Sequence, residues 1–421
     1  MSLRRTTTIF ALALLACLAA GVSPVPASGP LYVTGPDANQ PGTPYRWNNL
    51  SPISYATDRG NLGTQTTAQA DQLVLDAFNV WHGVSTASIS FQRAGQLGTD
   101  ITGSNITAFQ NAIGNCADAA QPTNAIIYDL DGSAVTALGY DNNSVLGFAG
   151  PVCFDDVAGT YTRGWAVMNG RFIDGQPTTV SHKTVSLRMF TAVFIHEFGH
   201  LIGLDHSQIN LNCLTDTSCP PADLAGVPTM FPVLIDVSMG TPKTDDKARL
   251  SQLYPAANFT STTGRIQGQV VFSDGVTPAQ GYNVVARQVG NPRSIAVSCV
   301  SGFLFTAGAG NPLAPQNPDG THGTDISYGS HDTSLIGYYD IPGLPPGDYT
   351  VEVEAINNSG DDAFVQGSSV GPIGQWLGFQ FKMPWTAAPL TETVTANNTQ
   401  VGEDVILSGT PPRYDAWEDG P

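Results

Sequence analysis

Three of the seven histidines in this 421-residue chain fall within one run of eleven residues. The run spans residues 196–206 and reads H-E-F-G-H-L-I-G-L-D-H. On a helix, residues four apart share one face, so His196 and His200 can present ring nitrogens to one ion. Glycine at position 203 can take a positive φ, end the helix and bring His206 back to the same ion. Three neutral imidazoles leave a fourth position for water, so the spacing predicts a catalytic site for one Zn²⁺.

Glu197 lies beside the first predicted ligand and is the candidate general base. Zinc lowers the pKa of bound water from about 16 toward ~7, and a neighbouring carboxylate can take its proton as the water attacks a carbonyl. Residues 189–195 are apolar nearly all round, which predicts a buried helix leading into the site. We expect Ser181 or Thr184 to cap the start of that helix.

The extended motif resembles the metzincin metalloproteases. That family places a methionine-containing turn beneath the zinc, and Met230, within Pro-Thr-Met-Phe-Pro, matches it. Residues 244–255, with two acidic residues near the start, predict a short helix capped by Thr244. The His-Ser pair at the third ligand, the Met-x-Pro turn and this helix are similar to the matrixin branch.

The resemblance covers residues 44–256 and implies their fold. It implies an α+β catalytic domain in which a twisted mixed sheet packs with three helices. Segments 52–55 and 88–91 are expected as strands and segment 70–81 as a helix, in the order that the family shows. Residues 146–151 would then form the edge strand along which a substrate chain pairs.

The sequence departs from the pattern of animal matrixins in two respects, a second metal site and a cysteine switch. Residues 129–150 contain no histidine, although animal matrixins carry a second, structural zinc site in this region. Asp129 and Asp131 are candidates for a Ca²⁺ site there, with an ordinary polar turn as the alternative. The mature chain has no cysteine before residue 116, so the cysteine switch that keeps animal matrixins latent is absent.

The N-terminus is typical of a secretory signal. Residues 1–28 contain two arginines, an apolar run from 9 to 22 and a small-residue cleavage site at 25–27. The apolar run is shorter than the about 20 residues of a membrane span, so we expect a secreted, extracellular protein without a transmembrane segment. The residues before Cys17 also resemble a lipoprotein signal, which leaves a lipid anchor at the cell surface as the alternative.

A change of composition after Pro255 predicts a second domain, rich in strands. The expected divisions are an N-terminal segment 29–43, the catalytic domain 44–256, a polar linker 257–263, an all-β sandwich 264–410 and a tail 411–421. Segments 265–271, 282–286 and 337–353, with a Leu-Pro-Pro-Gly-x-Tyr turn, resemble the prealbumin-like carboxypeptidase regulatory-like modules. The sandwich is a candidate for contact with a cell surface or matrix.

Residues 308–331 are rich in Gly, Asn and Pro and predict a long loop inserted into the sandwich. His322 and His331 are interpreted as solvated loop histidines, with a metal site as the alternative. Five cysteines follow the signal segment, and disulfides are the default outside the cell. Spacing alone does not fix their connectivity; we favour the pairs Cys116–Cys153 and Cys213–Cys219, which leaves Cys299 over.

The formal net charge of −18 argues against nucleic acids and anionic membranes as partners, since both attract basic patches. The leading hypothesis is a secreted zinc-dependent endopeptidase that acts on protein or peptide substrates. One alternative is an exported adhesin, or a carbohydrate- or surface-binding protein, with a vestigial metzincin fold. A zinc amidase or esterase would share the same site and differ in the walls of its cleft.

Overall fold

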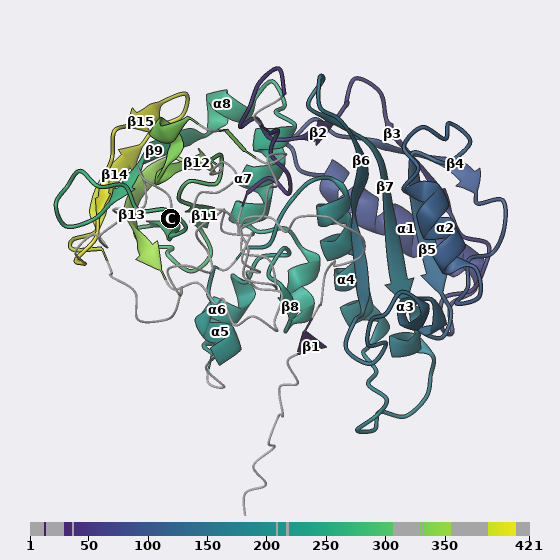
Figure 1. Cartoon of the computed structure of the whole chain (residues 1–421). Coiled ribbons are helices and arrows are strands. Elements are labelled where there is room, and N and C mark those ends of the chain that lie inside the picture. The colour runs from purple at the N-terminus through teal and green to yellow at the C-terminus, as the bar shows by residue number, and fades with distance from the viewer. Residues whose placement is uncertain are drawn as a thin grey trace, which may run out of the picture.

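The computed structural model (Figure 1) describes residues 12–13, 29–35, 38–207, 209–215, 219–305, 329–330, 332–354 and 386–409. Several predictions lie outside these residues and stay predictions. They concern most of the signal segment with Cys17, nearly all of the insertion with His322 and His331, and the tail 411–421.

A six-stranded mixed sheet forms the centre of the N-terminal half. Five strands are parallel, in the order β2-β7-β5-β3-β4, and β6 runs antiparallel to β7. The bounds are β2 (Arg46–Trp47), β3 (Ile53–Thr57), β4 (Phe91–Gln96), β5 (Asn124–Asp129), β6 (Gly147–Asp155) and β7 (Thr160–Asn169). Among the described strands β6 pairs with β7 alone, so it forms an edge of the sheet, where an edge strand was expected.

Helices cover both faces of this sheet, as Figure 1 shows. Side chains alternate along β5: Ile126 and Tyr128 join the buried cluster on one face, and Ala125 and Ile127 join the cluster on the other. The first face carries α1 (Thr67–His82) and α4 (Leu187–Leu201), and the second carries α2 (Ile106–Ile113) and α3 (Ser133–Ala137). Coverage of both faces explains why every residue of β5 is buried.

Shorter elements connect α4 to the second half. They are η1 (Gly170–Ile173) before α4, then α5 (Asn212–Thr215), α6 (Pro221–Ala225), β8 (Val233–Leu234), η2 (Val237–Gly240), α7 (Thr244–Leu253) and α8 (Phe259–Thr262). The two residues of β1 (Leu12–Ala13) pair with β8. Within the described residues, we find no helix with the length and apolar character that crossing a membrane requires.

Two predicted helix caps were wrong by a few residues. Ser186, rather than Ser181 or Thr184, caps α4, and its hydroxyl accepts a hydrogen bond from the Met189 N–H at 3.2 Å. Ser186 is the last residue before the helix begins, so only its side chain can reach that N–H. Helix α7 begins one residue earlier than expected, with Thr244 already inside it.

Two other predicted boundaries also differ from the structure. The strand expected from residue 88 begins at Phe91, because the Ser88 N–H donates to the Tyr254 carbonyl instead of to a sheet neighbour. The expected linker 257–263 contains the helical turn α8, and the hydroxyl of Thr262 donates to the carbonyl of Asn258 within that turn.

Two four-stranded sheets form the second half and complete an α+β chain. One has the order β11-β10-β13-β14, and the other has the order β12-β9-β15 with β16 also paired to β9. The bounds are β9 (Gly264–Val271), β10 (Asn283–Gln288), β11 (Ala296–Val300), η3 (Thr333–Leu335), β12 (Tyr338–Leu344), β13 (Gly347–Glu354), β14 (Leu390–Val394), β15 (Thr399–Val401) and β16 (Val405–Ile406). Apolar side chains of both sheets, such as Val284 and Ile341, belong to one buried cluster, which continues into the N-terminal half.

Candidate metal centre

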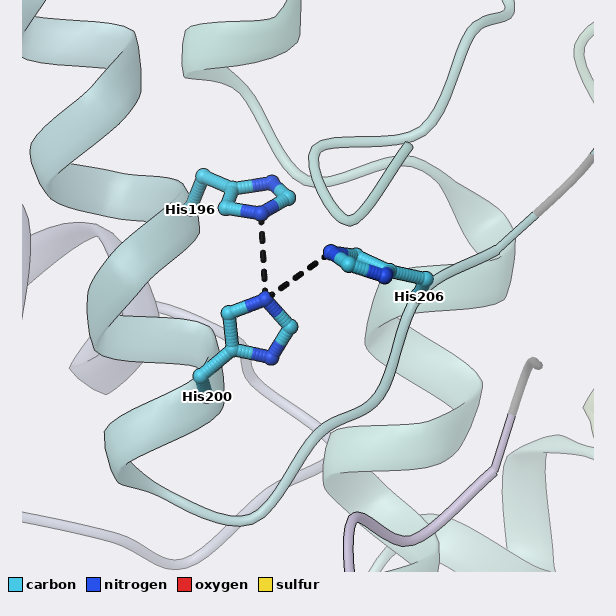
Figure 2. Close-up of side chains that lie close together, drawn as sticks. All are labelled: His196, His200 and His206. Carbon is cyan, nitrogen blue, oxygen red and sulfur yellow. Dashed lines mark hydrogen bonds between the residues drawn. The ribbon is translucent and has the colours of Figure 1, made fainter. Parts of the chain in front are cut away.

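The three histidines of the motif converge on one point. His196 and His200 project from the same face of α4, and the turn after the helix brings back His206 (Figure 2). The Nε2 atom of His200 lies 3.1 Å from Nε2 of His196 and 3.1 Å from Nε2 of His206. All three rings are buried. Among the described residues, this is the one cluster of three or more side chains arranged to hold a metal ion.

Hydrogen bonds at the other ring nitrogens decide what these Nε2 atoms can do. Nδ1 of His196 lies 2.8 Å from the Thr229 carbonyl, and Nδ1 of His200 lies 2.9 Å from the Leu204 carbonyl. A carbonyl can only accept, so both Nδ1 atoms carry the proton and both Nε2 atoms present lone pairs. Lone pairs that face each other at 3.1 Å repel unless a cation lies between them.

The distances suit a tetrahedral zinc ion. Zinc–nitrogen bonds of about 2.0–2.1 Å at tetrahedral angles place the two nitrogens about 3.3 Å apart. The observed separations of 3.1 Å need a shift of only a few tenths of an ångström. Carbonyl acceptors on the far ring nitrogens are also the usual outer partners of zinc-bound histidines. The residues present therefore fit one zinc ion.

Burial keeps the imidazoles neutral. It lowers the pKa of His196 to about 4, and burial together with the neighbouring His196 lowers the pKa of His200 to about 3. A histidine must be neutral to bind a metal. Both imidazoles are already neutral near pH 7, so metal binding does not have to displace a proton from them. The depressed pKa values thus favour a metal site across the neutral range.

Glu197 lies in the same buried region, and its carboxylate has few partners. Neither side-chain oxygen has a hydrogen-bond partner of good geometry among the described residues. Burial raises the pKa of Glu197 to about 8, and the nearby Ala149 N–H offsets this only in part. A divalent cation on the histidines would lower this pKa again, because the ion is the largest local charge. Strand β6 passes close by: a Cβ added at Gly147 would lie 3.3 Å from Cγ of Glu197.

Met230 packs against α4 beside the histidines. A Cβ added at Gly199 on α4 would meet Sδ of Met230 at 2.2 Å, so the methionine packs directly on the helix between its two histidines. The Met230 carbonyl accepts from the Ser207 N–H at 2.8 Å, next to the third histidine. The turn is held by Asp246, whose carboxylate accepts from the N–H groups of Thr229 at 2.9 Å and Met230 at 3.0 Å.

Gly203 makes the turn that returns His206. Its φ is +94°, in the region that residues with a Cβ rarely adopt, and an added Cβ would meet the Tyr161 ring at 2.8 Å. The N-terminal segment also pairs with this turn, because the Leu31 N–H donates to the Gly203 carbonyl at 2.7 Å. The turn is thus fixed by its own backbone and by two neighbours.

Gly203→Ala is expected to destabilise the protein by about 2–5 kcal/mol. Backbone strain at positive φ contributes roughly 1–2 kcal/mol, and the added methyl group in a packed site contributes roughly 1–3 kcal/mol. Urea denaturation of the metal-free protein measures the change. Gly139→Ala is the control: Gly139 has φ +91° but open space around it, so only the strain should appear there. An equal loss in both variants would contradict the close approach to Tyr161.

Asp129 and Asp131 give no support to a calcium site. The Asp129 carboxylate accepts from the N–H groups of Gly132 at 3.1 Å and Val135 at 2.9 Å, and Asp131 accepts from the Ser133 N–H at 3.0 Å. Both carboxylates therefore hold the polar turn that leads into α3. These hydrogen bonds are those of an ordinary polar turn, the alternative to a calcium site that the sequence left open.

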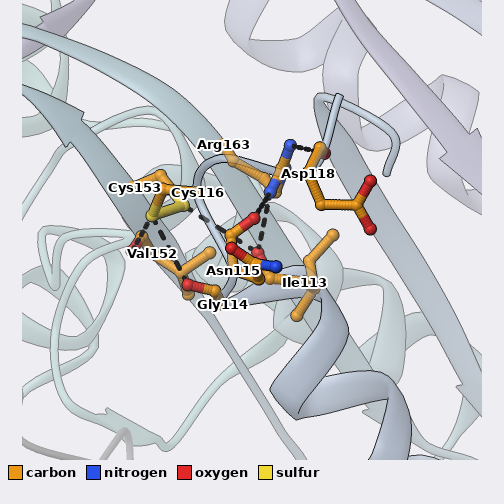
Figure 3. The surroundings of a disulfide bond; sticks show 8 residues. All are labelled: Ile113, Gly114, Asn115, Cys116, Asp118, Val152, Cys153 and Arg163. Carbon is orange, nitrogen blue, oxygen red and sulfur yellow. Dashed lines mark hydrogen bonds between the residues drawn. A yellow bond between two sulfur atoms is a disulfide. The ribbon is translucent and has the colours of Figure 1, made fainter. Parts of the chain in front are cut away.

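Both favoured disulfides are present. Cys116 joins Cys153 with Cα atoms 5.5 Å apart, Cys213 joins Cys219 with Cα atoms 4.8 Å apart, and Cys299 is a buried free thiol. Figure 3 shows that the first bond ties the loop after α2 to strand β6. Arg163 on β7 holds the same loop, since its guanidinium donates to three backbone carbonyls within residues 113–118.

Sequence reasoning missed three aromatic side chains that donate to carbonyls of α4, one at Ile195 within the helix and two at its C-terminal end. The indole N–H of Trp81 donates to the Ile195 carbonyl at 2.8 Å, and that of Trp47 donates to the Leu201 carbonyl at 2.7 Å. The Tyr254 hydroxyl donates to the Ile202 carbonyl at 2.7 Å. Carbonyls at a buried helix end require such partners. The sequence contains these two tryptophans and the tyrosine, but it gives no signal of the backbone carbonyls to which they donate.

Comparison with known proteins bears on this half of the chain. Residues 46–219 match the family model of the matrixins. The match contains all three histidines of the motif and Glu197, and it ends before Met230. This part of the chain is therefore a metzincin-like domain, and at the level of the family it is similar to zinc metalloproteases.

The comparison with solved structures adds no argument. GBS52, the minor pilin of the Gram-positive pathogen Streptococcus agalactiae, is 18% identical over 36% of this chain and 47% of its own, with a TM-score of 0.17. The chain thus matches about half the length of that pilin, and so low a TM-score supports no inference about fold or function. No curated protein matches the chain.

Proposed function

We propose that this protein is a secreted zinc-dependent endopeptidase. The observation that carries the proposal is the convergence of three Nε2 atoms, with that of His200 3.1 Å from each of the other two, beside a buried carboxylate without a well-aligned hydrogen-bond partner. In this proposal His196, His200 and His206 hold the zinc, Glu197 is the general base, and Gly203 and Met230 shape the site. The likeness of residues 46–219 to the matrixins supports the same reading.

The chemistry follows from the placement of Glu197. A zinc ion on the three histidines would supply a water of lowered pKa and polarise the scissile carbonyl. Glu197 accepts the proton of that water during the attack and then passes it to the nitrogen of the leaving amine. Both oxygens of the buried carboxylate lack a well-aligned partner among the described residues, so they can accept the proton and release it again.

The open edge of β6 supports a peptide as the substrate. The strand passes beside Glu197 and pairs with β7 alone among the described strands. An extended peptide can add to such an edge by main-chain hydrogen bonds, which would bring its carbonyl groups past the metal site. The disulfide to Cys153 fixes this strand to the loop after α2, so the edge is presented as a rigid template.

The wider assignments are also proposals. Two disulfides are compatible with export of the chain. We retain the division into a protease domain over residues 44–256 and a sandwich over 264–410, similar to the carboxypeptidase regulatory-like modules. Contact of that sandwich with a cell surface or matrix is part of the same proposal.

Profiling of the purified protein against a mixed peptide library tests the function. We expect cleavage at internal peptide bonds, loss of cleavage with a zinc chelator, and its return when zinc is added back. Cleavage of ester or non-peptide amide substrates alone would favour the amidase or esterase alternative. Zinc binding without any hydrolysis would favour a binding protein with a vestigial site.

A further inference from the structure

Helix α7 lies between the metal centre and the second half of the chain. It contacts β11 and β12, and its residues Asp245 and Arg249 are buried. Strand β11 is the outer strand of its sheet, so one side of its backbone needs partners other than a strand. Asp245 Oδ1 accepts from the Ser298 N–H at 2.8 Å, and the Arg249 guanidinium donates to the Ser298 carbonyl. Both backbone groups of Ser298 are therefore satisfied by α7.

The next residue of α7 faces the metal centre. Asp246 is buried and accepts from the Thr229 N–H at 2.9 Å. The carbonyl of the same Thr229 accepts from Nδ1 of His196 at 2.8 Å. Hydrogen bonds thus run from β11 to Asp245, through one peptide unit to Asp246, and through Thr229 to His196. Each group in this series is buried, so water cannot replace a lost partner easily.

A second contact joins the sandwich to the loop after His206. The Asn210 side chain accepts from Arg287 on β10 at 3.0 Å and donates to the Arg293 carbonyl at 3.2 Å. Arg293 also forms an ion pair with the buried Asp223. The loop closed by these contacts separates the third histidine from Met230. The two contacts therefore hold the segment 206–246 to the sandwich near its two ends.

We propose that the β-sandwich positions the metal centre, with Asp245 as the positioning residue. The proposal rests on the function proposed above. Outer partners of a metal-bound histidine fix the orientation of its ring, and their loss typically weakens metal binding about 10–100-fold. Asp245 does not contact His196 itself but acts on it through Asp246 and Thr229. The loss of zinc affinity on removing Asp245 should therefore lie near the low end of that range. The sandwich is then part of the working enzyme rather than a separable binding module.

Asp245→Ala in the full chain tests this inference. We expect the dissociation constant for zinc, measured by competition with a chromophoric chelator, to rise about tenfold. The visible spectrum of the Co²⁺-substituted protein should also shift, because the orientation of His196 changes. Hydrogen–deuterium exchange of the peptide around Thr229 should be faster in the metal-free variant. Asp245→Asn keeps an acceptor oxygen toward Ser298 and should bind zinc within about twofold of the wild type.

Two further variants keep the test decisive. Asp348→Ala removes an exposed carboxylate on β13 and should leave zinc affinity and the Co²⁺ spectrum unchanged. Arg249→Met removes the donor to the Ser298 carbonyl and keeps both aspartates, and it should weaken zinc binding about threefold. If Asp245→Ala does not fold, the zinc affinity of Arg249→Met tests the positioning role instead.

The outcomes separate this inference from the proposed function. Wild-type zinc affinity and an unchanged Co²⁺ spectrum in folded Asp245→Ala would overturn the positioning role, as would an equal defect in Asp348→Ala. A wild-type protein that binds zinc but cleaves no peptide would overturn the proposed function and leave the positioning of the metal intact.

Discussion

Glu197→Gln is expected to lower kcat for peptide hydrolysis by about two to four orders of magnitude while one zinc ion stays bound. Glutamine has nearly the same shape but cannot take a proton from water or return it to the leaving amine. The measurements are steady-state kinetics on a cleaved peptide and the zinc content of the same preparation.

The control for this variant is Glu392→Gln, the same change on β14 in the second half. It should retain wild-type kcat and zinc content. Near-normal turnover in Glu197→Gln would rule out the assigned base. Loss of zinc together with activity would assign the carboxylate to holding the metal instead.

His200→Ala should abolish stable zinc binding. Its Nε2 lies within 3.1 Å of both other ligand nitrogens, so it occupies the centre of the triad. Two histidines alone do not make the three-ligand set of a catalytic zinc site. In the wild type, zinc at about a thousandfold excess over its dissociation constant should add roughly 4 kcal/mol to the free energy of unfolding. In the variant that increment should vanish.

Thermal unfolding with and without zinc measures this increment. His82→Ala is the matched control, since this exposed histidine ends α1 and its ring contacts the Ile89 carbonyl rather than the triad. It should keep the full zinc-dependent rise in Tm. The same rise in His200→Ala would show that zinc binds elsewhere on the chain.

The sequence was most informative where a function depends on close spacing. The histidines at 196, 200 and 206 lie within one helix and one turn, so periodicity and a single glycine were sufficient to predict their convergence. The pair Cys213–Cys219 is equally local. Met230 was predicted only through the resemblance, because the segment that separates it from the third histidine gives no periodic signal.

The groups that support the site were beyond sequence reasoning because they come from distant segments. Thr229 looks like an ordinary turn residue, yet its N–H and carbonyl connect Asp246 to His196. Asp245 and Asp246 were expected to favour the helix N-terminus, and the structure gives them opposite directions, toward the sandwich and toward the turn. A contact such as Asp245 with Ser298 depends on how helix α7 packs against the sheet of the second half, which no local pattern encodes.

The central claim is that one zinc ion binds to three imidazole nitrogens and leaves a position for water. X-ray absorption at the zinc edge, on protein loaded with one equivalent of zinc, tests it most directly. The account predicts three nitrogens and one oxygen at about 2.0–2.1 Å, with the nitrogen signal reduced in His200→Ala. A sulfur ligand, or a shell of oxygens alone, would contradict it.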